Sequence, residues 1–165
     1  MFKRTHTCGE LDKSNVGEEV QLNGWINTVR LHGKIVFVDL RDRYGKTQLI
    51  FDEKKFPTQF EKIKKFSVED VISIKGTVEH RSDSSTNPSM KTGEVEVYTT
   101  NYIILNESEP LPFVLSDRNS AEEHFRLKYR YLELRIDELQ NNLIIRHDTY
   151  QATRKFLSKN NFLEI

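Results

Sequence analysis

The chain has 165 residues, of which 36% are hydrophobic and 30% are charged, and its 25 basic residues balance its 25 acidic residues. This length allows one well-buried core with a further short segment attached. A formal net charge of zero argues against a protein that coats nucleic acid through its overall charge. Binding to nucleic acid therefore has to come from a local patch, with shape and base stacking providing the selectivity.

The sequence offers few groups for disulfide, metal or membrane chemistry. Cys8 is the only cysteine, which excludes an internal disulfide and a cysteine-rich zinc site, so we expect a buried structural thiol. Four histidines do not have the spacing of metal ligands or of a catalytic triad, namely His6, His80, His124 and His147. The N-terminus lacks the apolar region of a secretory signal, and no stretch approaches the ~18–20 apolar residues of a membrane span. We therefore expect a cytoplasmic protein with no membrane partner.

Short β-rich runs separated by turn residues occupy the first half of the chain. Apolar and β-branched residues predict three consecutive antiparallel strands over residues 20–30, 35–40 and 46–51. A glycine-containing loop separates the first two runs, and a charged turn that ends in glycine separates the second and third.

The pattern changes after these three runs. Phe60, Ile63 and Phe66 recur at helical spacing among lysines, and extended runs return over residues 71–78 and 94–104. Three strands, a helix and two strands, in that order, make up the OB-fold, a five-stranded Greek-key barrel that binds oligonucleotides and oligosaccharides. An SH3-like or other small barrel would have a similar size, but the helix between the third and fourth strands favours the OB-fold.

The remaining sequence has a different texture. Residues 107–120 include two of the four prolines and show little periodicity, which is typical of a linker. Residues 121–135 and 137–160 are predicted to be helical, and residues 162–165 to begin a strand. In the second helix, one apolar stripe contains Leu139, Leu143, Tyr150 and Leu157. We expect a barrel domain over residues 1–106, a linker over 107–120, and the truncated helical start of a second domain over 121–165.

Strand alternation divides the barrel residues between two faces. Phe37 and Gln48 point outward from neighbouring strands if the barrel is filled by Val36, Val38, Leu49 and Phe51. An outward ring can stack on a splayed base, which is worth about 1–3 kcal/mol, and a side-chain amide can read the base's Watson–Crick edge. The alternation alone leaves open that Phe37 is a core residue, because aromatic residues in strands are usually buried, and that Gln48 is simply solvated.

Basic residues cluster at the same edge of the three strands: Arg30, Lys34, Arg41, Arg43 and Lys46. They could hold phosphates, but Asp39 and Asp42 lie between them and could instead neutralise them. The residues alone leave both readings open.

Several segments resemble a known family. Residues 4–11 (RTHTCGEL), 16–26 (VGEEVQLNGWI), 33–52 (GKIVFVDLRDRYGKTQLIFD) and 87–97 (NPSMKTGEVEV) resemble the anticodon-binding domain of bacterial-type aspartyl-tRNA synthetases. RLKYRYLELR resembles the first catalytic-domain segment of these enzymes, and KNNFLEI the opening of class II motif 1. Lysyl- and asparaginyl-tRNA synthetases share this barrel, but RTHTCGEL and NPSMKTGEVEV favour the aspartyl branch.

The resemblance implies roles for particular residues. It implies that the Phe37 ring stacks on the middle anticodon base, uridine, that Gln48 reads the same base, and that Arg30 lies at the anticodon. It implies further anticodon contacts for Arg81, Asn87 and Glu96, and extends the candidate loop contacts to His32 and Lys34.

The stretch that contains Arg30 departs from the family. Family members commonly have a run of arginines between the first strand and the loop glycine, whereas residues 27–33 contain one arginine. We therefore expect weaker contact with phosphates. His32 resembles the histidine of enzymes that also charge tRNA(Asn), although it could simply be an exposed loop residue.

The resemblance also implies what the parent enzyme does. Such enzymes are class II ligases, usually homodimers, that activate aspartate with ATP and magnesium and transfer it to tRNA(Asp). The segments that correspond to class II motifs 2 and 3 are missing from this sequence, so we expect no catalytic residue, no metal site and no ligation by this chain alone. The alternatives are the same region of a lysyl- or asparaginyl-tRNA synthetase, or a freestanding OB module that binds single strands.

Overall fold

The computed structural model describes residues 3–115, 117 and 120–165. The chain divides into two compact units, Met1–Leu111 and Pro112–Ile165. Of the linker expected over residues 107–120, positions 116, 118 and 119 lie outside the described residues, as do positions 1 and 2 of the expected barrel domain.

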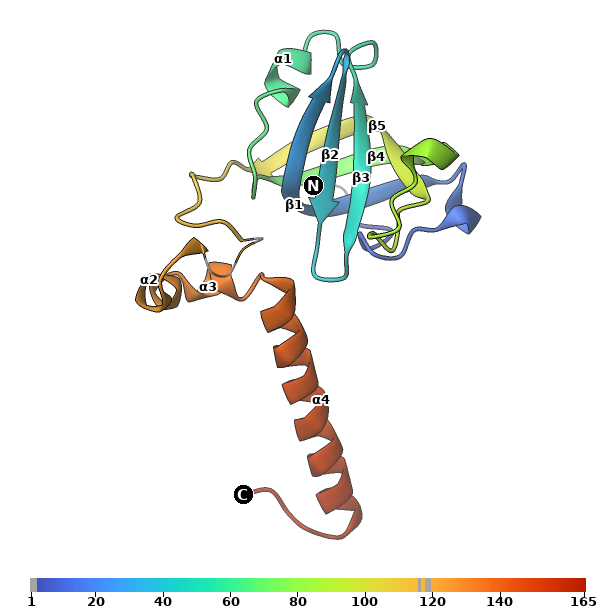
Figure 1. Ribbon diagram of the computed structural model, residues 1–165. Helices are drawn as coiled ribbons and strands as arrows, with labels where there is room; N and C mark the ends of the chain where they lie inside the picture. The colour runs from blue at the N-terminus through green and yellow to red at the C-terminus, as the bar shows by residue number, and fades with distance from the viewer. Residues whose placement is uncertain (1–2, 116, 118–119) are drawn as a thin grey trace. The chain divides into compact units, whose positions relative to one another are not determined.

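The first unit is a closed five-stranded barrel (Figure 1). Its strands are ordered β1-β2-β3-β5-β4, with β3 and β5 parallel and all other neighbours antiparallel. A helix connects β3 to β4, so this is the OB-fold that the order of elements predicted. The elements are η1 (Lys13–Asn15), β1 (Glu19–His32), β2 (Ile35–Arg41), β3 (Lys46–Asp52), α1 (Phe60–Ile63), β4 (Val71–His80), η2 (Asp83–Ser85) and β5 (Val95–Asn106).

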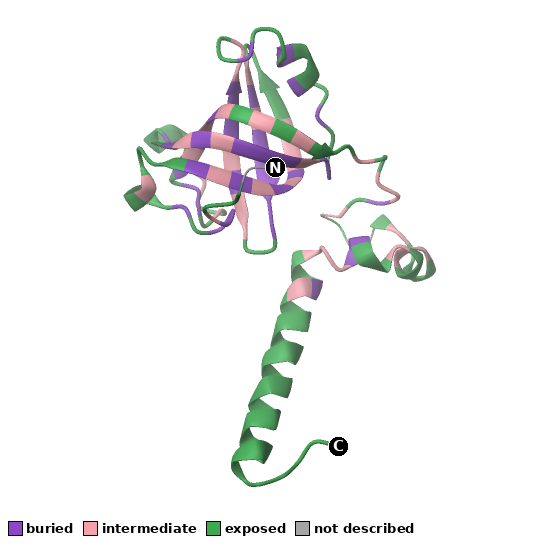
Figure 2. Ribbon diagram, turned by 180° about the vertical axis from the view of Figure 1, so that it is seen from behind, coloured by how far each residue is buried: buried purple, intermediate pink, exposed green. Residues whose placement is uncertain are grey.

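Alternate residues of each strand fill the barrel. Figure 2 shows buried residues alternating with more exposed ones along the strands. The four residues predicted to fill the barrel from β2 and β3 are all 0% exposed, namely Val36, Val38, Leu49 and Phe51. The Phe51 ring also contacts Phe56, Phe66 and Tyr102, with ring centroids 5.6–5.7 Å apart. The predicted division of these strands into two faces is confirmed.

Strand β1 pairs with two neighbouring strands, one along each half of its length. Its first half pairs with β4 up to Trp25, and its second half pairs with β2 down to His32. The register with β2 shifts between Ile26 and Thr28, so Asn27 is an extra residue in a β-bulge. The bulge lies immediately before the residues of β1 that belong to the candidate site.

Helix α1 is shorter than the apolar spacing suggested. It spans only Phe60–Ile63, because the amides of Lys65 and Phe66 bond three residues back rather than four, to the carbonyls of Lys62 at 3.0 Å and Ile63 at 3.2 Å. Phe60, Ile63 and Phe66 are nevertheless all buried. A spacing of three residues suits this tighter turn as well as an α-helix.

The described residues of the second unit form the α-helices α2 (Glu123–Lys128), α3 (Arg130–Glu133) and α4 (Asp137–Lys159). The prediction of one helix over residues 121–135 is wrong, because the backbone of Tyr129 leaves the helical region (φ −107°, ψ 43°). The Tyr129 ring packs on Phe125 at 5.2 Å between centroids. Among the described residues, no helix is long and apolar enough to cross a membrane.

The end of α4 also differs from expectation. No strand forms over residues 162–165, because the chain reverses directly after the helix. Asn161 adopts a left-handed conformation (φ 64°), its amide donates to the Ser158 carbonyl at 3.1 Å, and the Phe162 amide donates to the Leu157 carbonyl at 3.1 Å. These bonds form a Schellman motif, which directs the following residues back toward the helix.

Candidate nucleic-acid interface

Four strands present a patterned outer face. Strand pairing aligns Thr28 of β1 with Asp39 of β2, and Asp39 with Gln48 of β3; Gln48 in turn contacts Glu96 of β5. A second row, one side-chain repeat further along, contains Arg30, Phe37, Ile50 and Tyr98. The first row is polar and the second mostly apolar, so the face combines hydrogen-bonding groups with ring surfaces.

Arg30 is fixed in place by a bidentate ion pair. Its Nη1 and Nη2 donate to the two carboxylate oxygens of Asp39 at 2.8 and 2.9 Å, and the Thr28 hydroxyl donates to the same carboxylate. The Arg30 side chain remains 51% exposed, whereas that of Asp39 is 11% exposed. The guanidinium is therefore held rigidly but can still reach a ligand.

Gln48 continues this chain of hydrogen bonds. Its Oε1 accepts from Arg30 Nη2 at 3.0 Å, and its Nε2 donates to Glu96 Oε2 at 2.7 Å. These two contacts settle which end of the amide is the donor. One N–H and one oxygen lone pair of Gln48 are left for a ligand.

Phe37 lies outside the barrel core. Its neighbours Val36 and Val38 are 0% exposed, while Phe37 itself is half-buried. Its pairing partner on β3 is Ile50, which is only 8% exposed although it lies on the outer side. The outward orientation required for stacking on a base is thus present, and the core position that the alternation left open is excluded.

Arg81 approaches the same face from the end of β4. Its side chain is only 3% exposed; its Nε donates to the Val95 carbonyl at 3.0 Å and lies 3.8 Å from Glu96. Burial lowers the pKa of Arg81, against the opposing effect of Glu96. Its Nη2 is buried and has no hydrogen-bond partner among the described residues.

Asn87 organises its own loop. Its Oδ1 accepts from the amide and the hydroxyl of Ser89, at 3.0 and 2.6 Å, and its backbone amide donates to Gly93. Among the described residues, no hydrogen bond joins its side chain to Gln48 or Glu96. The structure therefore brings Arg30, Gln48, Glu96 and Arg81 together, and leaves Asn87 in the neighbouring loop.

His32 and Lys34 flank the β1–β2 turn. Gly33 between them has φ +59°, which suits the tight turn. His32 is exposed at the end of β1. Lys34 Nζ lies 2.9 Å from Glu53, and this hydrogen bond and ion pair raises the pKa of Lys34.

The basic cluster expected at this edge is reduced by the fold. Arg41 is 6% exposed, pairs with Glu69 and lies over the Trp25 ring at 5.7 Å, so it is not available to phosphates. Asp39 neutralises Arg30, which is one of the two possibilities that the sequence left open for the basic cluster. Asp42 instead mainly accepts backbone amides, including that of Cys8 at 2.9 Å.

Sequence reasoning missed three contributors to this face. It considered Asp39 only as a neutralising charge, and it did not single out Thr28 or Tyr98. Tyr98 lies beside Ile50, and its hydroxyl donates to Asp52 at 3.0 Å. Only the pairing register reveals that these three residues share one face, because they come from three different strands.

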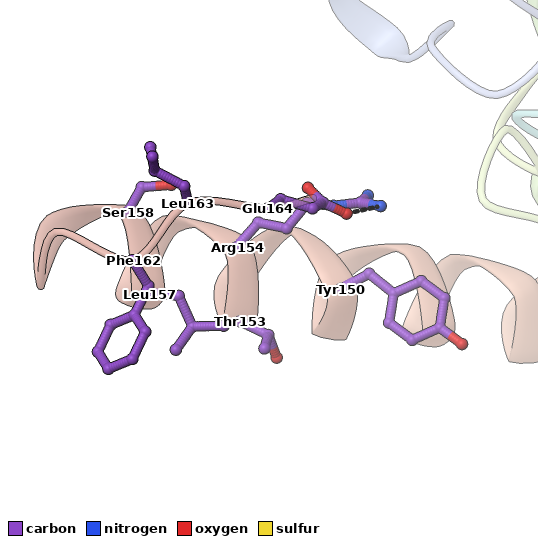
Figure 3. Close-up of a pocket in the computed structure, with 8 residues that line it drawn as sticks. All are labelled: Tyr150, Thr153, Arg154, Leu157, Ser158, Phe162, Leu163 and Glu164. Carbon is purple, nitrogen blue, oxygen red and sulfur yellow. Dashed lines mark hydrogen bonds and ion pairs between the residues drawn. The ribbon is translucent and has the colours of Figure 1, made fainter.

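A cleft of about 290 Å³ occurs in the second unit and is lined by none of these residues. It lies between the last turns of α4 and the reversed tail, where Arg154 donates to the Glu164 carboxylate at 2.9 Å (Figure 3). Tyr150, Leu157 and Phe162 line it. The apolar stripe predicted on α4 contributes to it, and Leu143, Tyr150 and Leu157 are 40–49% exposed.

No group of three or more metal-ligating side chains occurs in the part of the chain that the structure describes. The side chains of the candidate interface are hydrogen-bond donors and acceptors, rings and paired charges. This chemistry suits the recognition of unstacked bases, and we assign no residue of this chain to ATP or magnesium.

Comparison with known proteins gives the same picture. Residues 20–105 match the family described as OB-fold nucleic acid binding domain, and residues 122–165 match the class II tRNA synthetases of the D, K and N type. Aspartate–tRNA(Asp/Asn) ligase of Caldanaerobacter subterraneus subsp. tengcongensis is 47% identical, with 99% of this chain and 28% of the relative aligned. The corresponding ligase of Aquifex aeolicus is 44% identical, with 99% and 27% aligned.

A solved structure agrees on the fold. The aspartyl-tRNA synthetase of Entamoeba histolytica superimposes with a TM-score of 0.87 at 20% identity, covering 99% of this chain and 39% of that one. The chain spans little more than a quarter of the length of the curated relatives above. It belongs to the family of OB-fold nucleic acid binding domains, and nearly its whole length is similar to part of the aspartate–tRNA(Asp/Asn) ligases.

Proposed function

We propose that the outer face of β1, β2, β3 and β5 binds the anticodon of tRNA(Asp). The observation that carries this proposal is the hydrogen-bonded chain from Arg30 through Gln48 to Glu96, with the outward Phe37 ring in the adjoining row. An anchored amide beside a free ring can grip one unstacked base by its edge and its face at the same time.

Each side chain has a defined task in this proposal. Phe37 stacks on the middle base, uridine, and Gln48 reads that base with its remaining N–H and lone pair. Arg30 and Arg81 donate to acceptors of the anticodon, and Glu96 orients both Gln48 and Arg81. Asn87, His32 and Lys34 contribute from the two loops beside the face.

The unpartnered Arg81 Nη2 supports this arrangement. A buried guanidinium nitrogen without an acceptor is costly, and an incoming base or ribose oxygen would supply one. The paired charges of the face have a second effect: Arg30 is compensated by Asp39, and Arg81 lies close to Glu96. Such a face favours base edges over bare phosphate.

For the whole protein we propose the activity in the names of its relatives, ligation of aspartate to tRNA with ATP and magnesium, by a homodimer in the cytoplasm. Residues 1–106 would be the anticodon-binding domain, residues 107–120 the linker and residues 121–165 the start of the catalytic domain. The 165-residue chain by itself should show no aspartate-dependent exchange between ATP and pyrophosphate. Exchange above that of a heat-denatured sample would contradict this assignment.

A second tRNA enters the proposal through His32. The relatives are named for tRNA(Asp/Asn), and His32 is exposed at the turn beside the face. We propose that the chain accepts both the aspartate anticodon GUC and the asparagine anticodon GUU, which differ only in the third base.

The test is binding of this chain to anticodon stem-loops that differ only in their three anticodon bases. We expect similar affinities for GUC and GUU, and weaker binding when the middle uridine is replaced by cytidine. Equal affinity for all loops would disprove anticodon recognition. Selective binding of GUC over GUU would disprove only the second proposal, and preference for a lysine anticodon would favour the lysyl alternative.

A further inference from the structure

A lysine-rich segment follows directly after β3. Residues 53–66 contain five lysines and two glutamates, whereas the chain as a whole is neutral. The segment includes α1 and joins β3 to β4, at the end of the barrel where β3 finishes. A local excess of positive charge is the feature that the neutral overall composition requires of a protein that binds nucleic acid.

Four of the five lysines have no acidic partner. Lys64 pairs with Glu61 at 2.5 Å, and Glu53 is taken by Lys34. The others are exposed, and no ion pair involves them within the described ranges: Lys54, Lys55, Lys62 and Lys65. We call these four residues the lysine patch.

The backbone that carries the lysine patch is anchored. Phe56, Phe60, Ile63 and Phe66 are 0–8% exposed and belong to or pack in the barrel core. The turn that starts the segment is capped by Asp52, whose side chain accepts the Lys54 amide at 2.9 Å. Because the apolar residues face inward at a spacing of three or four, the lysines between them are directed to solvent.

The segment is continuous with the candidate interface. Asp52 pairs with Ile35 on β2 and accepts the Tyr98 hydroxyl, and the Glu53 amide donates to the Lys34 carbonyl at 3.0 Å. Two residues of strand separate Asp52 from Ile50, which corresponds to about 7 Å. Strand β3 thus ends one side-chain repeat beyond the row that contains Phe37, and the lysine patch begins two residues later, at Lys54.

The charges of the interface leave a role for such a patch. Arg30 is neutralised by Asp39, Arg81 lies beside Glu96, and Arg41 is buried with Glu69. Phosphate contacts nevertheless supply much of the affinity of proteins for nucleic acids and fix the register in which the bases are read. Lysines without partners at the edge of the face can make those contacts.

We propose that the lysine patch binds backbone phosphates of the same RNA whose unpaired bases lie on the outer face of the barrel. The ligand is RNA backbone of any sequence, held as point charges by flexible ammonium groups. This inference relies on the proposed function only for the identity of the RNA. In this arrangement the neutral outer face binds the bases, and the positively charged lysine patch binds the RNA backbone.

The experiment compares two variants with equal loss of charge. One carries Lys→Gln at Lys54, Lys55, Lys62 and Lys65, and the control carries Lys→Gln at the exposed residues Lys3, Lys128, Lys155 and Lys159. The dissociation constant for the GUC stem-loop is measured between about 50 and 300 mM salt, a range over which the release of counterions changes the affinity strongly. Circular dichroism establishes that both variants are folded.

We expect the patch variant to lose up to about 3 units of the slope of log K against log salt, because each of the four phosphate contacts contributes about 0.7–0.9 units. The control should keep most of the slope, and the preference for uridine over cytidine at the middle position should stay unchanged in the patch variant. An unchanged slope in the patch variant, or an equal loss in the control, would overturn the proposal. If the wild-type chain fails to distinguish the loops while the patch variant still loses slope, anticodon recognition fails and the lysine patch stands.

Discussion

The Arg30 guanidinium and the Asp39 carboxylate lie side by side on β1 and β2, joined by two hydrogen bonds of 2.8 and 2.9 Å. Such bidentate pairs add geometric specificity to their energy. The pair orients Arg30 so that its Nη2 also reaches the Gln48 oxygen at 3.0 Å. Asp39 thereby controls, through Arg30, the direction in which the Gln48 amide faces.

Replacing Asp39 with asparagine should therefore weaken base reading rather than RNA binding as a whole. The asparagine offers one acceptor oxygen in place of the two that hold Arg30, and it leaves the arginine charge uncompensated. We expect the preference for uridine at the middle position to fall by about 1.5–3 kcal/mol, the value of a hydrogen bond to a charged group. Non-specific affinity and its salt dependence should rise. Stem-loop titrations at two salt concentrations measure both effects.

The control for charge is Asp148→Asn on the exposed surface of α4, which should leave the base preference unchanged. A loss of affinity in Asp39→Asn that is equal for all loops, together with a lower melting temperature, would show that Asp39 is only structural.

Phe37→Ala should separate binding from stability. Because the ring lies outside the core, we expect the unfolding free energy to fall by about 1 kcal/mol or less, while binding weakens by about 1–3 kcal/mol. Leu49→Ala, at a position that is 0% exposed on the neighbouring strand, should instead cost about 2–5 kcal/mol of stability. Chemical denaturation and stem-loop binding of both variants test this. Equal destabilisation by the two substitutions would refute the outward orientation.

Cys8 should be inert in the folded protein. Burial raises the pKa of its thiol, and the neighbouring Asp42 carboxylate raises it further. At pH 8 we expect an aromatic disulfide reagent to label Cys8 at least about a thousandfold more slowly in the native chain than in denaturant, because labelling requires unfolding. Rapid labelling of the native protein would contradict the burial.

The same raised pKa has a consequence for stability at alkaline pH. The unfolded thiol ionises near pH ~8.5, while the folded thiol keeps its proton. Its contribution to stability is therefore complete below that pH and declines as the pH rises above it. Denaturation of wild type and Cys8→Ala at pH 7 and pH 10 should show a steeper decline for wild type.

Glu133 should make the second unit sensitive to acid. Burial alone would raise the pKa of Glu133, but the hydrogen bonds and charges of Arg130 and Arg126 lower it below its usual range. Its folded pKa thus lies below the unfolded value of about 4.3, so its stabilisation is present above that pH and is lost as the pH falls through the folded pKa. Hydrogen exchange of α2 and α3 between pH 3 and 7 measures this loss.

Two variants serve as comparisons in the hydrogen-exchange experiment. Glu133→Gln removes the negative charge and leaves one acceptor oxygen where the two arginines now share two, so it should destabilise α2 and α3 at neutral pH, with little further change on acidification. Glu123→Gln, at an exposed position of α2, should behave like wild type. An acid transition that persists in Glu133→Gln would assign the sensitivity to another group.

The parts of the fold that could be predicted are those that depend on local periodicity. The two-residue repeat of β2 and β3 placed Phe37 and Gln48 on the face opposite Val36 and Leu49, but it left open which face fills the barrel. The burial of Val36 and Leu49 shows that Phe37 and Gln48 lie on the outer side. The order of strands and helix was sufficient for the OB-fold. The roles of the site residues came from resemblance, and they remain proposals.

What could not be predicted depends on partners that are distant in sequence. From the sequence, Arg41 was expected to be a surface arginine. In the structure it is buried and pairs with Glu69, which lies 28 residues further along the chain. The break at Tyr129 interrupts an unbroken helical pattern, and it is accompanied by the convergence of Arg126 and Arg130 on Glu133. Neither contact leaves a periodic signal in the sequence.

The extra residue in β1, Asn27, determines which side chains a ligand can meet. Residues of even number face the core before it, as Leu22 and Ile26 do, yet after it Thr28 and Arg30 face outward. If Asn27 were an ordinary ladder residue rather than a bulge, strict alternation would turn Arg30 inward and Val29 outward. This one extra residue therefore determines which side chains of the second half of β1 lie on the candidate interface.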